Sequence, residues 1–589
     1  MPLTAHTAVI RRLTVEAGTG PLRRTATDVP GPLLQSLGRG GPESLPARSA
    51  VFLGGFVIRS LLATSHQGLP VHTLASPGAA LRQAHAELHS KRVDLALVAT
   101  LDDPATGALT VQLLRRAAEA LAESDTVIGV LTGLDGDSDS APVLRPLRYG
   151  RRRTDQDPER HRLLLWSGND EADEARVRHE LRSMLDEIHP DAFPELPTSV
   201  PCGQALGPQR AAAVTTAAQA SAAVGKAAAV STRRPRPIAL LFPGQGSQHT
   251  AMAAGLYRNE PVFTAAVDAV FDLFGEEGAA VRADWLRPAA EQTIAVDDVR
   301  RAQPLLFAVD YALGRLVLSW GVRPAALLGH SAGELVAATL AGVVSLADGV
   351  AMMRERVRHA VKIPAGGMLA VAASADALRP YLFGDVAIAA VNANQQTMLA
   401  GPSEPLAAVA TALRADDYTV VAVPATSPFH CPAMAPASDA VEVAYRRIRL
   451  NPPEIPLYSG YTGELMTADE ALSPRYWARQ ITDTVQFAPA LEQLLAADDV
   501  LLVEAGPRQT LTAFARRHRA VRLGASAAIP LLPARPGTAE GDRTSVLTAA
   551  ARIWTEGHDL NQQALAHLWN WSADGGVESP RRLATIGQP

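Results

Sequence analysis

From residue 238 onward, short apolar runs alternate with amphipathic stretches of helical period. The first run, at 238–242, is wholly apolar and predicts a strand. A second apolar run ends at 328, and a helical pattern follows it at 335–340. The alternation continues to about residue 532, and a further helix is predicted near 545–556. It indicates α/β layering for this half of the chain.

The first half shows a weaker alternation. Residues 1–45 are rich in Gly, Pro and Arg without a sustained period, so we expect them to be irregular. The Ala-rich run at 211–230 favours a helix or linker, and the prolines that follow it mark a domain boundary near 236. The remaining predictions are helices at 79–91, 111–122 and 170–188 and strands at 93–98, 126–131 and 163–166.

A different order of elements lies inside the second half. Between 368 and 424 the pattern predicts strand, helix, strand, strand, helix and strand. That order is the signature of a ferredoxin-like unit. We expect such a subdomain, with bounds 366–424, inserted in the larger α/β fold.

Composition excludes several classes of protein. A hydrophobic fraction of 47% can bury large cores, which excludes a disordered chain. A net charge of −5 gives no broad basic footprint for nucleic acid. Two cysteines are too few for a disulfide framework, and no metal site is expected. The best membrane candidate, 50–63, is too short to span a bilayer and contains Arg59, so we expect a soluble cytoplasmic protein.

The sharpest chemical signal is a Gly-x-Ser-x-Gly turn at 329–333. It joins an apolar strand to a helix, which is the setting of a nucleophile elbow that exposes Ser331. Glycines permit the tight packing of such a turn. The backbone N–H of Ala332, at the start of the helix, could face a developing oxyanion.

A nucleophilic serine needs a base. His430 follows a predicted strand and lies in a proline-punctuated loop from which an imidazole could project. The chain has fifteen histidines, so spacing alone leaves the choice of base open.

Several motifs together resemble a known family. They are Phe-Pro-Gly-Gln-Gly-Ser-Gln at 242–248, Gln303-Pro304, the elbow at 329–334 and Phe429-His430. In this order they are similar to malonyl-CoA:acyl carrier protein transacylases and to the acyltransferase domains of modular polyketide synthases. The resemblance covers about 238–535. It implies an acyltransferase fold, in which an α/β-hydrolase-like large subdomain carries an inserted ferredoxin-like small subdomain.

The resemblance also implies roles for individual residues. Ser331 is the nucleophile and His430 its base, oriented by a backbone carbonyl rather than by a carboxylate. The N–H groups of Gln245 and Ala332 form the oxyanion hole. The further residues that the resemblance places at the substrate are Gln303, His330, Arg356, Asn392 and Phe429.

Two of these residues bear on the acyl group. Arg356 lies 25 residues beyond Ser331, on the helix that carries the family's carboxylate-binding arginine. A planar guanidinium binds a carboxylate through two hydrogen bonds and keeps its charge. Phe429, just before the histidine, resembles the bulky residue of malonyl-selective pockets, where it would crowd an α-methyl group.

The flanking regions carry looser resemblances. Residues 1–149 are similar to a truncated ketosynthase in which Ala75 stands where the nucleophilic cysteine belongs, so no condensation is expected. Residues 150–236 resemble the linker between ketosynthase and acyltransferase domains, 237–535 the acyltransferase itself, and 536–589 the linker that follows it.

Together these features predict a free-standing acyltransferase for polyketide-type, antibiotic-like biosynthesis. It would move a malonyl-type group from coenzyme A to an acyl carrier protein supplied in trans, through an acyl-serine and without a bound cofactor. One alternative is an editing hydrolase that clears acyl groups from carrier proteins, although such enzymes typically replace the arginine. Another is a non-catalytic assembly protein that serves as a docking surface.

Overall fold

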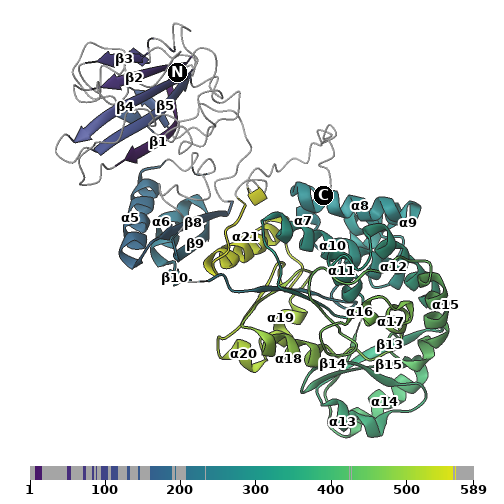
Figure 1. Cartoon of the computed structure of the whole chain (residues 1–589). Helices are drawn as coiled ribbons and strands as arrows, with labels where there is room; N and C mark the ends of the chain where they lie inside the picture. The colour runs from purple at the N-terminus through teal and green to yellow at the C-terminus, as the bar shows by residue number, and fades with distance from the viewer. Residues whose placement is uncertain are drawn as a thin grey trace. The chain divides into compact units, whose positions relative to one another are not determined.

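The chain forms two compact units in a computed structural model (Figure 1). The first comprises Met1–Thr154 and Gly203–Ala205, and the second comprises Asp155–Cys202 and Leu206–Pro589. The structure describes the strands of the first unit and a few helical residues there, and in the second unit chiefly residues 160–188, 207–232, 234–423 and 427–561.

The first unit contains a seven-stranded mixed sheet in the order β3-β2-β4-β5-β1-β6-β7. Strand β2 runs parallel to β3 and β4, and the other neighbours are antiparallel. Residue 75 lies outside the described residues, so the ketosynthase-like reading of this unit stays a prediction. The strands are β1 (Thr7–Val15), β2 (Ser49–Gly54), β3 (Val71–Leu74), β4 (Leu95–Asp103), β5 (Ala108–Arg116), β6 (Gly129–Thr132) and β7 (Val143–Arg145).

Three local predictions are wrong. Strand β1 forms within the segment expected to be irregular, and β5 occupies the start of the helix predicted at 111–122. In the second unit, the Ala-rich segment at 211–230 begins as strand β9 (Gln209–Thr215). Alanine favours helices intrinsically, but in each case pairing with neighbouring strands outweighs local propensity.

A small α/β part opens the second unit. Strands β8 (Arg162–Gly168), β9 and β10 (Val230–Ser231) form an antiparallel sheet with β9 in the centre. Helices α5 (Glu171–Glu187) and α6 (Ala220–Lys226) supply side chains to a core that also contains Trp166. The expected strand at 163–166 and helix at 170–188 are thereby confirmed.

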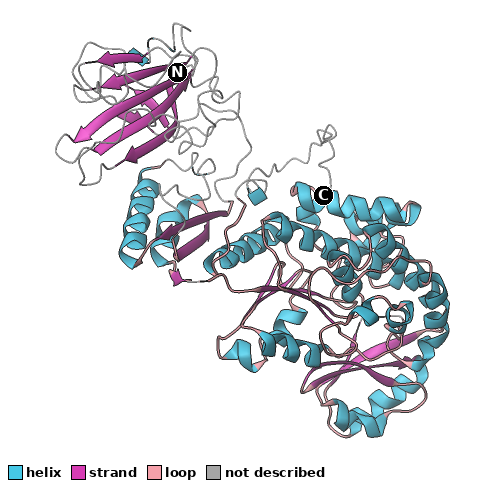
Figure 2. Cartoon of the chain, in the orientation of Figure 1, coloured by secondary structure: helices cyan, strands magenta, loops and turns pink. Residues whose placement is uncertain are grey.

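A five-stranded parallel sheet forms the centre of the larger part, in the order β17-β12-β11-β18-β19 (Figure 2). All five residues of β11 are buried, because helices cover both faces of the sheet. The strands are β11 (Ile238–Phe242), β12 (Ala326–Gly329), β17 (Leu457–Tyr458), β18 (Leu501–Glu504) and β19 (Ala527–Pro530).

The alternation of side chains along β11 divides the core in two. Leu240 and Phe242 face a large cluster that includes side chains from α8, α10, α11 and α12. Ala239 and Leu241 face a second cluster with side chains from α18 and α19. The helices of this part are α7 (Ala254–Tyr257), α8 (Pro261–Phe274), α9 (Glu276–Leu286), α10 (Val299–Ser319), α11 (Gly333–Leu340), α12 (Leu346–Ala360), α15 (Ala435–Tyr445), α16 (Ala468–Ala471), α17 (Pro474–Arg479), α18 (Phe487–Ala497), α19 (Thr510–Ala515) and α20 (Arg519–Arg522).

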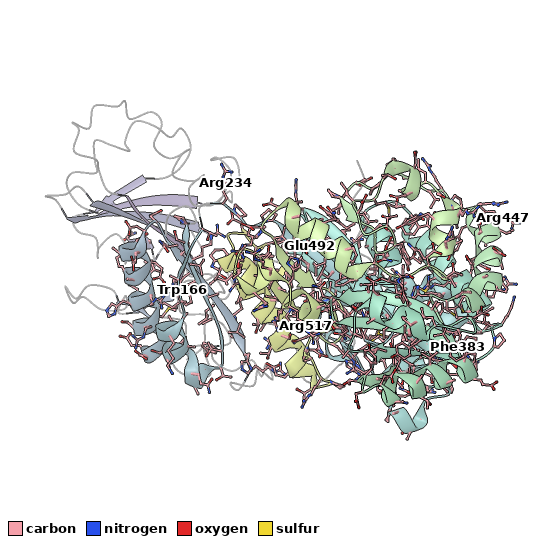
Figure 3. All side chains as sticks on the ribbon, turned by 90° about the horizontal axis from the view of Figure 1, so that it is seen from below. Trp166, Arg234, Phe383, Arg447, Glu492 and Arg517 are labelled. Carbon is pink, nitrogen blue, oxygen red and sulfur yellow. The ribbon has the colours of Figure 1, made fainter. Side chains whose placement is uncertain are left out.

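The inserted subdomain has the expected ferredoxin-like order. Its antiparallel sheet runs β14-β15-β13-β16, and its own core includes residues of α13 and α14. Phe383, labelled in Figure 3, is half exposed on this subdomain. The elements are β13 (Gly366–Val371), α13 (Ala375–Leu378), β14 (Ala387–Ala393), β15 (Gln396–Pro402), α14 (Ser403–Ala415) and β16 (Val420–Val423).

Helix α21 (Ala539–Thr555) connects the end of the chain with the small α/β part. The indole N–H of Trp554 donates to the carbonyl of Trp166 at 3.3 Å, and the guanidinium of Arg210 lies 4.6 Å from the Trp554 ring centroid (Figure 3 labels Trp166). The helix predicted near 545–556 is therefore present, and it packs against β8 and β9.

Candidate active site

The nucleophile elbow joins β12 to α11. Ser331 has a φ of 53°, a left-handed backbone conformation that costs about 1–3 kcal/mol for a residue other than glycine. The amide of His330 donates to the carbonyl of Phe242 on the neighbouring strand β11 at 2.8 Å. The sharp bend is thus held from the side by the central sheet.

The two glycines of the motif allow this bend to pack. A Cβ atom on Gly329 would lie 2.2 Å from the backbone nitrogen of Glu334, and one on Gly333 would lie 2.2 Å from the carbonyl oxygen of Phe242. Both distances are too short for any side chain. The motif therefore reflects close contact between strand, turn and helix.

The turn places Ser331 against His430. The serine Oγ lies 2.6 Å from the histidine Nε2, although the residues are 99 positions apart. Both side chains are buried, with 7% and 2% of the residue surface exposed. This distance is within hydrogen-bonding range for a nucleophile and its base.

A backbone carbonyl sets the tautomer of His430. Its Nδ1 lies 2.9 Å from the carbonyl oxygen of Asp483, and its amide donates to the carbonyl of Ile481 at 2.8 Å. A carbonyl only accepts, so Nδ1 must carry the proton and Nε2 is left to accept from Ser331. A backbone carbonyl thus occupies the position where other serine enzymes have a carboxylate.

The surroundings keep His430 neutral. Burial, followed by the positive charge of Arg356, lowers the pKa of His430 from 6.5 to about 3. A neutral imidazole is the form that can take a proton from a serine.

Two backbone amides lie beside the serine. A Cβ on Gly244 would be 3.1 Å from the Cβ of Ser331, so the loop after β11 runs directly past the nucleophile. Within the described residues, the N–H groups of Gln245 and Ala332 donate to no protein acceptor. Ala332 is also the first residue before α11, where helix amides favour negative charge.

Arg356 lies on α12 and is almost fully buried, with 3% of its surface exposed. Its Nε donates to Oε1 of Gln303 at 3.0 Å, and Nε2 of Gln303 donates to Oε1 of Gln245 at 3.1 Å. Nη2 of Arg356 and Nε2 of Gln245 are buried without a hydrogen-bond partner. A buried charge of this kind calls for an anionic partner.

Phe429 forms one wall beside Arg356. The guanidinium carbon lies 5.0 Å from the phenyl centroid, close enough for a cation–π contact. The ring is 3% exposed and packs in the main core cluster. The residue before the base is thereby in contact with the arginine.

The other two predicted residues contact each other. Nε2 of His330 lies 2.8 Å from Oδ1 of Asn392, which is carried by β14 of the inserted subdomain. His330 also lies 5.6 Å from the ring centroid of Phe487. All nine predicted site residues therefore lie on segments that meet around the elbow, and their roles remain proposals.

Among the residues that the structure describes, no group of three or more His, Cys, Asp or Glu side chains is arranged to hold a metal ion. Within the same part of the chain, every helix is too short or too polar to cross a membrane.

The acyl transferase domain model matches residues 239–545, more than half of the chain. The chain belongs to the acyl transferase domain family. A protein of the phenolphthiocerol/phthiocerol polyketide synthase of Mycobacterium tuberculosis is 36% identical over 343 residues, which is 56% of this chain and 22% of that protein. Mycoketide-CoA synthase of the same organism is 39% identical over 279 residues, 46% of this chain and 6% of the relative. The acyltransferase thus spans less than a quarter of the length of these relatives.

Solved structures show the same fold. The acyl transferase domain of SpnD, in complex with 2-(pent-4-yn-1-yl)malonyl, superposes with a TM-score of 0.59 at 26% identity, covering 69% of this chain and 97% of that one. The acyltransferase domain from the second module of the salinomycin polyketide synthase gives a TM-score of 0.53 at 28% identity, covering 69% and 85%. The predicted acyltransferase fold is confirmed.

Sequence analysis missed the residues that support His430 in this acyltransferase. The carbonyls of Ile481 and Asp483 come from a segment with no motif, because any residue type can supply a backbone carbonyl. Glu334 belongs to the elbow segment, but its partners, among them Tyr476, lie more than 120 residues away. Nothing in the local sequence predicts those contacts.

Proposed function

We propose that this acyltransferase moves a malonyl-type group from coenzyme A to the phosphopantetheine thiol of an acyl carrier protein, in polyketide-type biosynthesis. The observation that carries the proposal is Arg356, a buried cation beside the Ser331–His430 pair whose Nη2 has no partner. The free carboxylate of a malonyl group would supply that partner. The reaction needs no cofactor besides the thioester substrate.

In the first half-reaction, Ser331 Oγ attacks the thioester carbonyl while His430 Nε2 takes the serine proton. The negative oxygen of the tetrahedral intermediate is stabilised by the amides of Gln245 and Ala332. Collapse of the intermediate breaks the carbon–sulfur bond, and His430 returns the proton to the departing sulfur of coenzyme A. Each amide of such an oxyanion hole contributes about 3–4 kcal/mol to the transition state.

In the second half-reaction, the carrier thiol gives its proton to His430 Nε2 and attacks the acyl-serine. Ser331 then leaves and recovers the proton from His430. Between the two steps, Arg356 holds the malonyl carboxylate and keeps the acyl group oriented.

We further propose that the carrier protein is supplied in trans and that the reaction takes place in the cytoplasm. The division into a ketosynthase-like region, a linker, the acyltransferase and a second linker is part of this proposal. The contacts between α21 and strands β8 and β9 support a joint structural role for the two linkers.

Intact-mass measurement tests the function. The protein is incubated with malonyl-, methylmalonyl- and acetyl-CoA, and a separately expressed carrier protein is then added. We expect one malonyl adduct that is absent in Ser331→Ala and that moves to the carrier. An adduct that persists in Ser331→Ala would contradict the assignment of the nucleophile, and loss of the adduct to water rather than to any carrier would indicate an editing hydrolase.

A further inference from the structure

Glu334 is a buried carboxyl group that the proposed reaction does not use. It lies in the first turn of α11, three residues beyond Ser331, and none of its surface is exposed. Its side chain contacts the segment at 459–480 rather than the substrate side of the elbow. An acid in such a place needs strong hydrogen-bond partners.

Three donors meet this carboxyl group. Gly460 donates its amide to Oε2 at 2.7 Å, while the Tyr476 hydroxyl and the Gln480 amide donate to Oε1 at 2.5 and 3.2 Å. A Cβ on Gly460 would lie 2.8 Å from Oε2, so the backbone approaches the carboxyl as closely as only glycine allows.

The direction of the tyrosine hydrogen bond follows from a proton count. The hydroxyl oxygen of Ser459 accepts the amides of Tyr461 and Thr462 at 3.0 and 2.9 Å. It therefore donates its own proton to the Tyr476 oxygen, 2.5 Å away. The tyrosine proton is left for Glu334. With three donors aimed at it, the group is suited to act as an acceptor-only carboxylate, and these contacts offset the burial that raises the pKa of Glu334 to about 8.

The segment held by Glu334 also holds the base. Gln480 directly precedes Ile481, whose carbonyl accepts the His430 amide, and Asp483 supplies the carbonyl for Nδ1. The Gln480 carbonyl in turn accepts the Tyr461 hydroxyl at 3.2 Å. One carboxyl group thus connects the helix that follows the nucleophile to the carbonyls that orient the base.

We propose that Glu334 is a positioning residue that keeps Asp483 in register with His430, so that Nε2 faces the Ser331 hydroxyl. This inference rests on the proposed Ser331–His430 chemistry but not on the identity of the acyl group. Loss of the carboxylate lets the segment at 480–483 shift, and the histidine then loses the acceptor that fixes its tautomer.

A phosphonofluoridate tests this without an acyl donor. Such a probe phosphonylates an activated serine with loss of fluoride, and intact mass reports the rate at Ser331. We expect Glu334→Gln to slow the reaction at least tenfold, because its amide turns a donor toward the Gly460 or Tyr476 donor. Tyr476→Phe should have a smaller effect in the same direction. Glu260→Gln makes the same chemical change at a buried helix cap outside this network and should leave the rate unchanged.

A double-mutant comparison separates positioning from a general loss of structure. In a His430→Ala background, Glu334→Gln should cause no further loss of the residual rate, because it acts only through the histidine. An unchanged rate in Glu334→Gln alone, or an equal loss with and without His430, would overturn the proposal. If Glu334→Gln does not fold, Tyr476→Phe decides by the same comparison. Normal phosphonylation without malonyl transfer would refute the proposed acyl group and leave this inference intact.

Discussion

The guanidinium of Arg356 lies over the ring of Phe429, with 5.0 Å between the guanidinium carbon and the ring centroid. Phe429 is the residue before His430, whose pKa the same arginine lowers. The group proposed to recognise the acyl carboxylate therefore also acts on the base and contacts the wall that would face the acyl α-carbon. Selectivity and catalysis share one set of contacts.

Replacing the arginine should change the preferred acyl group. With Arg356→Ala, we expect malonyl loading of Ser331 to fall at least 100-fold while acetyl loading falls much less, because only malonyl loses a charge partner. A buried unpaired charge costs about 2–5 kcal/mol, which sets the size of the change. Competition between malonyl- and acetyl-CoA, read by intact mass, measures the ratio. An unchanged ratio would show that another cation binds the carboxylate.

The base should work well below the ordinary histidine range. Because burial and Arg356 lower the pKa of His430 to about 3, its neutral form persists as pH falls. We expect kcat/KM for acylation to show no inflection near pH 6.5 between pH 5 and 8. In Arg356→Ala the loss of the positive charge should move the inflection upward. A wild-type rate that halves near pH 6.5 would contradict the buried, uncharged state of this histidine.

Phe429 should set tolerance for a substituent on the acyl α-carbon. Phe429→Ser removes the ring beside Arg356, and we expect the preference for malonyl over methylmalonyl to shrink about 10- to 100-fold. One methyl group is worth about 1–3 kcal/mol in a close-fitting pocket. The ratio of the two adducts, measured in competition, checks this. Phe383→Ser serves as the control, since that ring is half exposed on the inserted subdomain.

A transfer assay with water as the competing acceptor should separate the remaining functions. We expect the acyl-serine of the wild-type protein to react with a carrier thiol at least 100-fold faster than it hydrolyses. Release of free malonate at the same rate with and without carrier would favour the editing hydrolase instead. The measurement is the decay of the Ser331 adduct after removal of malonyl-CoA.

Glu260 should make stability depend on pH. Burial raises the pKa of this carboxyl from 4.5 to about 7, so the folded protein retains a proton that the unfolded chain releases in this range. The free energy of unfolding should therefore fall as pH rises from 4.5 to 7, by up to about 3 kcal/mol from this group. Glu260→Gln should remove that part of the slope. Urea unfolding at pH 5, 6 and 8 measures it, and an equal slope in the variant would contradict the assignment.

The sequence by itself determined much of the acyltransferase. Apolar runs such as 238–242 specify strands covered on both faces, and the glycines around Ser331 specify a turn too tight for side chains, because both properties depend on residues close in the chain. The order of strands and helices at 366–424 likewise specified the inserted ferredoxin-like subdomain.

Only the tertiary structure decided how His430 is held and what Glu334 contacts. The carbonyl of Asp483 has no sequence signature, since every residue carries one, and its position depends on a segment 53 residues beyond the histidine. The alanine-rich strand β9 shows the same limit from the opposite side, because pairing with β8 outweighed a local preference for helix. Contacts between distant segments set these features, and no local pattern of residues records them.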